Sequence, residues 1–373
     1  MSVVRGDTTR RWVTVLVAIG LIGVTPLLIS ARPVGSTGLS ADEVVAGAKL
    51  SAAVPHDGLV EIEATLGIPK LPVASDQVAI LDRTTRARTW WASPTSWRVD
   101  TLTGTGQDIT FATANGHGSV RQWSFENDTV TDVIVDPALR FPRTDDLVPP
   151  QAARRILGWM GPTDRVEPLA ARRVAGISAA GARIVPGDAR SSVGHVDLWV
   201  DPANGLPLQV DVFAVGGTRP VLSTRFLDVQ LGRPAADVLA PTFVPTARQR
   251  TTSTPDLLSR ISANGNVPLP DRIGDLDRVT TGVVPVGIGT YGTGFTRVMV
   301  VPIPGRFMDE IFDSVSKTGT KLTVAGGEAS LLSSPLVTVI VARTDVDGQG
   351  FLVAGTLKPA ALQATLAALL AAR

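Results

Sequence analysis

The stretch HVDLWVDPANGLPLQVDVF, from His195 to Phe213, alternates apolar and polar residues on both sides of a central interruption. Successive side chains of a strand point to opposite faces, so each flank predicts a half-buried strand. The interruption, DPANGLP, combines proline, asparagine and glycine, which are the residues that form tight turns. The stretch therefore predicts an antiparallel hairpin with one apolar face. The residues of that face are Val196, Leu198, Val200, Leu208, Val210 and Val212.

Further strands, separated by short turns, are predicted on both sides of this hairpin. They cover residues 58–66, 77–92, 96–102, 108–113, 119–125, 129–135, 172–177, 182–187 and 221–229. Consecutive strands with short connections favour an antiparallel meander over a parallel sheet with crossover helices. Two helices are also predicted, one beginning at Ser40 in a capping box with Glu43 and one over residues 147–160.

Three of the strands carry aromatic or other large apolar residues at alternating positions. With the hairpin, these positions predict a sheet with one apolar and one polar face. Either the two helices cover the apolar face completely, or they leave an apolar cleft for a ligand. The candidate residues lining such a cavity are Trp97, Val99, Ile109, Phe111, Trp123, Phe125, Val196, Leu198, Val200, Leu208, Val210 and Val212.

The pattern changes after residue 245. Residues 246–256 are rich in threonine, proline and arginine without periodicity, which is typical of a linker. Residues 257–373 then mix short strands with helices, the last helix being PAALQATLAALLAA at 359–372. They predict a compact α+β domain of ordinary size.

The N-terminal segment has the pattern of a membrane-targeting sequence. Residues 12–31 contain no charged residue. Arg10 and Arg11 precede them, and Arg32 follows. A run of this length spans the hydrocarbon core of a bilayer, and the preceding arginines favour a cytoplasmic N-terminus for residues 1–11. We expect a signal-anchor, with a cleaved signal peptide as the alternative, followed by a tether at 32–39. Either way the rest of the chain is expected outside the cytoplasm, membrane-anchored or, after cleavage, periplasmic or secreted.

Composition excludes several kinds of site. The formal net charge of +1 gives no electrostatic footprint for nucleic acid, and the chain contains no cysteine. The motif GIGTYG at 287–292 matches a dinucleotide-binding pattern, but a β-branched segment follows it where a helix is needed, so a glycine-rich hairpin or loop is the better interpretation. His56, His117 and His195 lack the spacing of metal ligands. We expect no cofactor, no metal and no enzymatic activity.

Two pairs of adjacent carboxylates are candidates for acid–base chemistry. They are Asp145 with Asp146, and Asp309 with Glu310. Adjacent carboxylates point in different directions, which suits a solvated loop or helix face better than a catalytic pair.

The order of several motifs resembles a known superfamily. SPTSWRVDTLTGTGQDITFATANGHGSVRQWSFENDTV (93–130) resembles the LolA-like superfamily, which includes lipoprotein carriers and the MucB/RseB regulators. LWVDPANGLPLQVDV (198–212) and RRVAGISAAGARIVPGD (172–188) resemble the MucB/RseB branch in particular. Together the motifs place a LolA-like domain at residues 40–245.

This resemblance implies an α+β fold: a curved antiparallel half-barrel with helices on its concave face, followed by a smaller C-terminal domain. It further implies a regulator or sensor that binds a hydrophobic ligand or lipid and a membrane partner such as an anti-sigma factor. The alternative function is a lipid or lipoprotein carrier of the cell envelope. A permanent anchor would count against such a carrier, because a carrier must shuttle.

Overall fold

A computed structural model describes residues 12, 35, 37–67, 79–112, 120–134, 136–137, 139–243, 247–253, 267–280, 287–344 and 350–372. The predicted membrane segment, residues 12–31, lies outside this part of the chain except for Trp12, and His117 also lies outside it. Among the described residues, no helix combines the length and the apolar character needed to cross a membrane.

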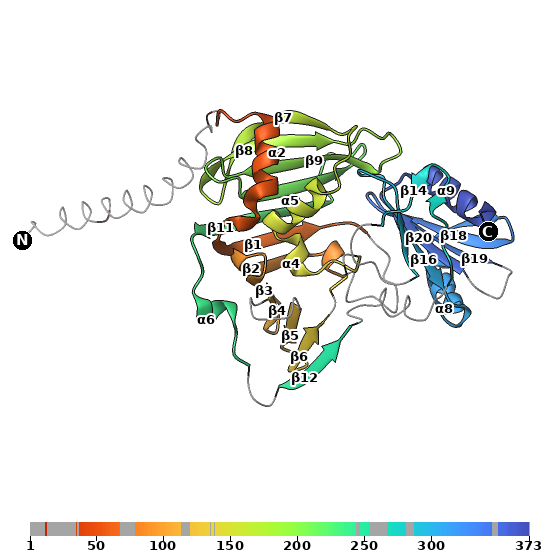
Figure 1. The fold of residues 1–373 in the computed structure, drawn as a ribbon, viewed down its shortest axis with the longest axis horizontal. Coiled ribbons are helices and arrows are strands. Elements are labelled where there is room, and N and C mark those ends of the chain that lie inside the picture. The colour runs from red at the N-terminus through yellow and green to blue at the C-terminus, as the bar shows by residue number, and fades with distance from the viewer. Residues whose placement is uncertain are drawn as a thin grey trace, which may run out of the picture.

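The first domain is built on one large open sheet (Figure 1). Its strands within the described residues are β1 (His56–Ala64), β2 (Thr84–Ser93), β3 (Ser96–Leu102), β4 (Gln107–Ala112), β5 (Val120–Ser124), β6 (Thr129–Val133), β7 (Arg165–Val174), β8 (Ile177–Val185), β9 (Val193–Val200), β10 (Pro207–Ala214), β11 (Leu222–Leu231) and β12 (Arg248–Thr252). Their spatial order is β12-β6-β5-β4-β3-β2-β1-β11-β10-β9-β8-β7. The two edge strands, β12 and β7, do not pair with each other, so the curved sheet stays unclosed. The predicted half-barrel is confirmed.

Three differences from the predicted strands have local causes. The predicted strand at 172–177 instead contains the end of β7 and the start of β8, because Ala175 and Gly176 have positive φ and form the turn between them. Residues 248–252, inside the predicted linker, form β12 and pair with β6 in parallel, which makes the sheet mixed. This segment, RQRTT, is charged and largely exposed, as edge strands commonly are, so it carries no hydrophobic alternation. The predicted strand at 77–92 begins only at Thr84, because Ile80–Asp82 form the short 3-10 helix η2.

The helices of the first domain lie across one face of this sheet (Figure 1). They are α2 (Ala41–Leu50), the 3-10 turn η1 (Ser51–Ala53), α4 (Thr144–Leu147) and α5 (Pro149–Leu157), while α6 (Ala236–Leu239) contacts β3. The capping box predicted for α2 is confirmed, since the Glu43 amide donates to Ser40 Oγ at 3.3 Å and the Ser40 amide donates to the Glu43 carboxylate at 2.7 Å.

The second domain has its own sheet. In the described residues it contains β15 (Gly289–Tyr291), β16 (Val298–Ile303), β17 (Thr320–Val324), β18 (Gly327–Ser333), β19 (Thr338–Thr344) and β20 (Gly350–Gly355), with a separate ribbon of β13 (Arg272–Ile273) and β14 (Leu276–Asp277). Helix α9 (Pro359–Ala371) packs on one face and α8 (Gly305–Ser316) on the other, because Ile340 and Ala342 belong to the core beneath α9 while Val341 belongs to the core beneath α8. The predicted α+β character of this region is confirmed.

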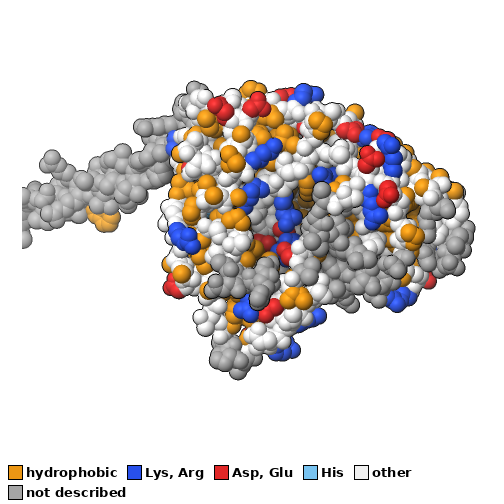
Figure 2. Space-filling model, viewed as in Figure 1, with side chains coloured by type: hydrophobic (Ala, Val, Ile, Leu, Met, Phe, Trp, Pro, Cys, Tyr) orange, Lys and Arg blue, Asp and Glu red, His pale blue; other side chains and the backbone are white. Residues whose placement is uncertain are grey.

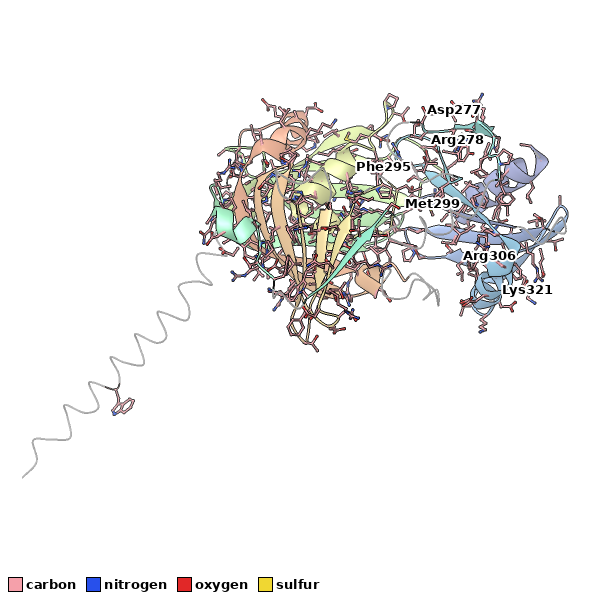
Figure 3. All side chains as sticks on the ribbon, turned by 60° about the horizontal axis from the view of Figure 1, so that its bottom comes forward. Asp277, Arg278, Phe295, Met299, Arg306 and Lys321 are labelled. Atoms are coloured by element: carbon pink, nitrogen blue, oxygen red, sulfur yellow. The ribbon has the colours of Figure 1, made fainter. Side chains whose placement is uncertain are left out.

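Backbone hydrogen bonds join the two domains. The Ser192 amide donates to the Thr356 carbonyl at 3.0 Å, and the Lys358 amide donates to the Arg190 carbonyl at 2.9 Å. Phe295 of the second domain lies at this junction and packs into the core of the first (Figure 3). The segment just before β9 therefore belongs to the first domain and also contacts the second.

Candidate binding site

Helices cover only one half of the inner face of the large sheet. Helix α2 packs on β7, β8 and β9, and α5 packs on β10 and β11. Their apolar faces, including Val44, Val45 and Ile156, merge with those strands into one core. We call this region the covered half, and β4–β6 with β12 the open half.

The hairpin turn at 201–206 fixes α2 against the covered half. The Asp201 carboxylate accepts hydrogen bonds from the Ala203 amide at 3.0 Å and the Asn204 side chain at 2.7 Å, which hold the turn. Gly205 has φ +74°, and a Cβ there would lie 2.6 Å from the backbone of Gly47 in α2. Glycine is thus required twice, by the turn's backbone conformation and by the approach of the helix.

Six of the predicted cavity residues lie in this covered half. They are Val196, Leu198, Val200, Leu208, Val210 and Val212, all buried in the core that α2 and α5 close. Strand pairing confirms the predicted hairpin, with Leu198 opposite Val210 and Val196 opposite Val212. Their side chains fill space between sheet and helices, and none lines either of the two cavities described below.

Trp97 and Val99 also face inward. Trp97 stacks on Trp91 of the neighbouring strand, with ring centroids 6.3 Å apart, and borders a small cavity under α5. Val99 is 1% exposed.

The remaining four predicted residues lie on the other face, which corrects the sequence interpretation. Trp97 pairs with Ala112 and Val99 with Thr110, and directly paired residues share a face of the sheet. Ile109, Phe111, Trp123 and Phe125 occupy the alternate positions and therefore point outward. Phe243, after α6, packs there at 5.8 Å from Phe111 and 5.6 Å from Trp123 between ring centroids. Alternation defines two faces of a strand, but only the pairing register decides which of them is concave.

The inner face of the open half is consequently polar. Thr110 of β4 lies opposite Gln122 of β5, which lies opposite Thr131 of β6, and Thr131 lies opposite Arg250 of β12. A cavity of about 860 Å³ opens over this row. Its lining residues are Ile80, Arg83, Thr101, Asp108, Ile109, Thr110, Gln122, Trp123, Ser124, Asn127, Thr129, Thr131, Arg140, Phe141, Pro142, Arg143, Thr144, Arg248, Gln249 and Arg250. Ile109 and Trp123 border it although their strands direct their side chains outward.

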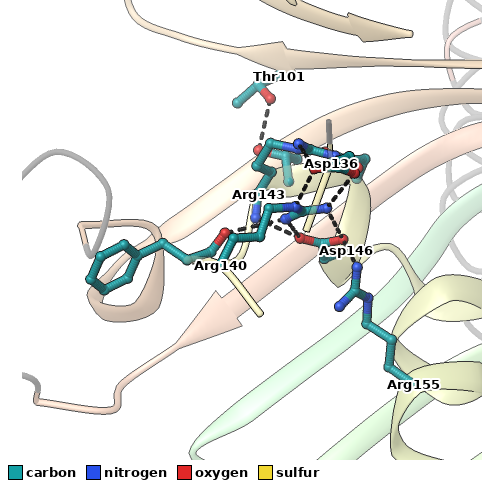
Figure 4. A network of polar contacts seen from close by, with 9 residues as sticks. Thr101, Asp136, Arg140, Arg143, Asp146 and Arg155 are labelled. Carbon is teal, nitrogen blue, oxygen red and sulfur yellow. Dashed lines mark hydrogen bonds and ion pairs between the residues drawn. The ribbon is translucent and has the colours of Figure 1, made fainter. Parts of the chain in front are cut away.

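Arg140 and Arg143, which line this cavity, belong to a largely buried network of charges (Figure 4). We call it the arginine–aspartate cluster; its members are Asp136, Arg140, Arg143, Asp145, Asp146 and Arg155. Arg140 donates to Asp136 at 2.7 Å and to Asp146 at 3.0 Å, and Arg143 donates to Asp136 at 2.9 Å and Asp145 at 3.0 Å. Thr101 of β3 donates to Thr144 at 2.8 Å, which ties this segment to the sheet.

The cluster overturns one sequence interpretation. Asp145 and Asp146 were expected to be solvated, yet both are buried, because α4 turns them toward the arginines. Burial alone raises the pKa of Asp146, but the hydrogen bond and charge of Arg140 outweigh it and lower that pKa below its usual value. Asp309 and Glu310 are exposed on α8, as predicted. In the sequence, the signal for the cluster is a short run with charges of both signs, DPALRFPRTDD at 136–146.

Three cations of the large cavity stand apart from the cluster. Arg83, Arg248 and Arg250 are exposed, and none forms an ion pair within the described residues, although Arg248 donates to the Asn127 carbonyl at 2.8 Å. On the same face as the helices, blue and red side chains lie near one another between apolar residues (Figure 2). Phe141, which also lines the cavity, packs against Ile288 and Val301 of the second domain. The cavity thus has a mixed lining of polar and apolar side chains, carries arginines without ion-pair partners among the described residues, and includes one residue, Phe141, that packs on the second domain.

His56, His195 and the glycine motif are each part of ordinary packing within the described residues. His56 is fully buried, its Nδ1 lies 2.9 Å from the Val54 carbonyl oxygen, and burial lowers its pKa to about 4. His195 stacks on Phe213 at 4.2 Å on the outer face. GIGTYG forms β15 and its flanks, antiparallel to β16, so the predicted hairpin is confirmed. Among the described residues, no group of three or more His, Cys, Asp or Glu side chains could hold a metal ion.

Comparison with solved structures finds the following similarities. The crystal structure of MucB in complex with MucA(peri) is 16% identical and covers 88% of this chain and 97% of that chain, with a TM-score of 0.49. The complex of Pseudomonas aeruginosa MucA/MucB is 17% identical over 88% of this chain and 97% of that chain, with a TM-score of 0.47. A LolA superfamily protein from Nitrosomonas europaea is 10% identical over 55% of this chain and 99% of that chain, with a TM-score of 0.26. No family model matches the sequence, and neither does any curated protein.

Proposed function

We propose that the chain is a non-enzymatic, membrane-tethered, extracytoplasmic regulator of the MucB/RseB type. Its large cavity would hold an anionic segment of a membrane partner, such as the extracytoplasmic part of an anti-sigma factor. The observation that carries this proposal is the polar inner face of the open half, where Arg83 and Arg250 remain without ion-pair partners in the described part of the chain. Unpaired guanidinium groups around a concave polar surface favour carboxylates, which they bind through charge-assisted hydrogen bonds.

The position of the cavity supports a protein partner. It is bordered by the segment 140–144, in which Arg140 and Arg143 belong to the arginine–aspartate cluster and Phe141 packs against Ile288 and Val301 of the second domain. A partner seated there would contact Phe141, and a regulator can use such a contact to couple binding to the second domain. The uncharged N-terminal run at 12–31 would keep the protein next to a membrane partner.

The same geometry disfavours the carrier alternative. An acyl chain requires an apolar lining, but the apolar residues of the covered half are already packed under α2 and α5, and the large apolar residues Ile109, Phe111 and Trp123 of β4 and β5 point outward. A hydrophobic ligand, as predicted from the sequence, would have to displace one of these helices. We therefore assign the large cavity to a polar partner.

Charge reversal at the cavity tests the proposal. The full-length protein in its native membranes would be cross-linked and purified, as wild type, as the double variant Arg83→Glu/Arg250→Glu, and as the control Arg219→Glu/Arg233→Glu. The control residues are also exposed and lie outside the cavity. We expect one acidic membrane protein to be recovered with wild type and control, and recovery to fall roughly tenfold with the cavity variant.

Two outcomes would count against the regulator. Equal recovery with both double variants would mean that the cavity arginines do not bind the partner. Stoichiometric lipid in an organic extract, together with no protein partner, would favour the carrier.

A further inference from the structure

Arg154 is a largely buried cation without a carboxylate partner. It lies on α5, with its guanidinium carbon 5.0 Å from the centroid of the Trp91 ring, and it donates to Ser51 Oγ at 3.4 Å. It takes part in no ion pair among the described residues. Desolvation lowers the pKa of Arg154 to about 10. A guanidinium taken out of water normally acquires a counter-charge, because the uncompensated state is costly.

Gln151 stands one helical turn before Arg154, on the same face of α5. Both polar atoms of its side-chain amide are buried, and neither has a hydrogen-bond partner in the described part of the protein. Buried amides are nearly always hydrogen-bonded, so an unpartnered one requires an explanation. A donor and a cation thus lie side by side with unused binding capacity.

Both residues line a second, smaller cavity of about 230 Å³, which adjoins the large cavity. The stacked rings of Trp91 and Trp97 form its apolar wall, and the arginine–aspartate cluster forms the rest. The cluster contributes three arginines and three aspartates and is balanced, so Arg154 leaves the cavity with one net positive charge. The cavity is smaller than the roughly 300–1,000 Å³ of sites for drug-sized ligands.

From this arrangement we infer that the small cavity is a binding site for a small organic carboxylate. The carboxylate accepts hydrogen bonds from Arg154 and from the Gln151 amide group, and an aromatic or aliphatic body lies against Trp91 and Trp97. One negative charge balances the cavity, and planar ligand bodies suit the aromatic wall. This site adjoins the large cavity at Arg140 and Arg143, but the groups that bind the carboxylate, Arg154 and Gln151, line only the small cavity, so the inference does not depend on the partner proposed for the large one.

Benzoate and its neutral isostere benzamide are suitable probes. Binding would be measured on the full-length protein in detergent micelles by saturation-transfer NMR and tryptophan fluorescence. We expect saturable binding of benzoate and at least roughly tenfold weaker binding of benzamide, because only benzoate pairs with the guanidinium. Absence of saturable benzoate binding, or equal binding of the two probes, would overturn the site.

Variants locate the bound probe. Arg154→Gln and, independently, Gln151→Leu should each weaken benzoate binding, the first by roughly tenfold or more. The matched control is Arg172→Gln, whose guanidinium carbon likewise lies over a tryptophan, 4.6 Å from the ring of Trp199, but outside the cavity. Unchanged binding in either cavity variant, with the fold verified by circular dichroism, contradicts the assignment.

His56 supplies a readout that a purely structural role of Arg154 would not produce. The charge of Arg154 is one of the causes that lower the pKa of His56. Benzoate bound to Arg154 should therefore raise the pKa of His56, measured by NMR, whereas benzamide should leave it unchanged. A pKa of His56 that does not respond to saturating benzoate would contradict binding at Arg154.

Discussion

The covered and open halves of the large sheet have the same alternation of apolar and polar residues but opposite orientations. In β9 and β10 the apolar side chains point inward and meet α2 and α5. In β4 and β5 the large apolar side chains of Ile109, Phe111 and Trp123 point outward, where Phe243 packs, and Thr110 and Gln122 lie on the concave face. One continuous sheet therefore contains a filled apolar core and a polar cavity. The helices mark the boundary, since they cover only strands whose inner face is apolar.

The largest expected effect comes from breaking the wall of the open half. Arg140→Met should lower the free energy of unfolding by about 3–5 kcal/mol, because it leaves the buried carboxylates of Asp136 and Asp146 without a main partner. Urea titration measures this change. The control is Arg121→Met, which removes an arginine from another arginine–aspartate pair of the same half.

The two arginines differ mainly in exposure. The Arg140 side chain is 4% exposed and that of Arg121 is 47% exposed. We expect the Arg121 substitution to cost at most about 1 kcal/mol. If both substitutions cost the same, the cluster would not be the element that stabilises this half.

A core substitution tests the covered half. Leu198→Ala should cost about 3 kcal/mol, because Leu198 is buried between the sheet and its helices and its truncation leaves a cavity. Thr110→Ala, at an inner position of the open half, should change the free energy of unfolding by no more than about 0.5 kcal/mol. Guanidinium unfolding followed by tryptophan fluorescence compares the two, and similar losses would contradict the distinction between filled and open halves.

The third prediction concerns pH and His56, which lies on β1 between the two halves. Its pKa is about 4 in the folded protein and near 6.5 when unfolded, mainly because burial disfavours the charged ring. Between these values only the unfolded chain binds the proton, so stability falls as pH drops from about 6.5 to about 4. The loss attributable to His56 is on the order of 3 kcal/mol.

Two variants isolate this contribution. His56→Phe should reduce the difference in unfolding free energy between pH 7.5 and pH 4, whereas His195→Gln, which alters a partly exposed ring, should affect it much less. An unchanged pH dependence in His56→Phe would show that other groups cause the acid destabilisation.

Local patterns predicted much of this architecture. The hairpin, the capping box of α2, the helix at α5 and the antiparallel order of the strands follow from alternation, turn residues and caps, which are short-range signals. The parallel edge strand β12 was not predicted, because a charged edge strand has no hydrophobic period. The arginine–aspartate cluster was not predicted either. Its charges resemble a solvated face until α4 and α5 bring them together.

By itself, the sequence of residues 195–213 determined that two strands pair and that Val196, Leu198 and Val210 share a face. It likewise determined that Trp97 and Val99 share a face, and that Ile109 and Phe111 share one. Only the tertiary structure decided that the first pair faces inward and the second outward. The physical reason is that a side-chain period of two defines two equivalent faces, and only inter-strand register and helix packing distinguish them. The same long-range packing buries Arg154 without a carboxylate partner among the described residues, and no local sequence pattern predicts this.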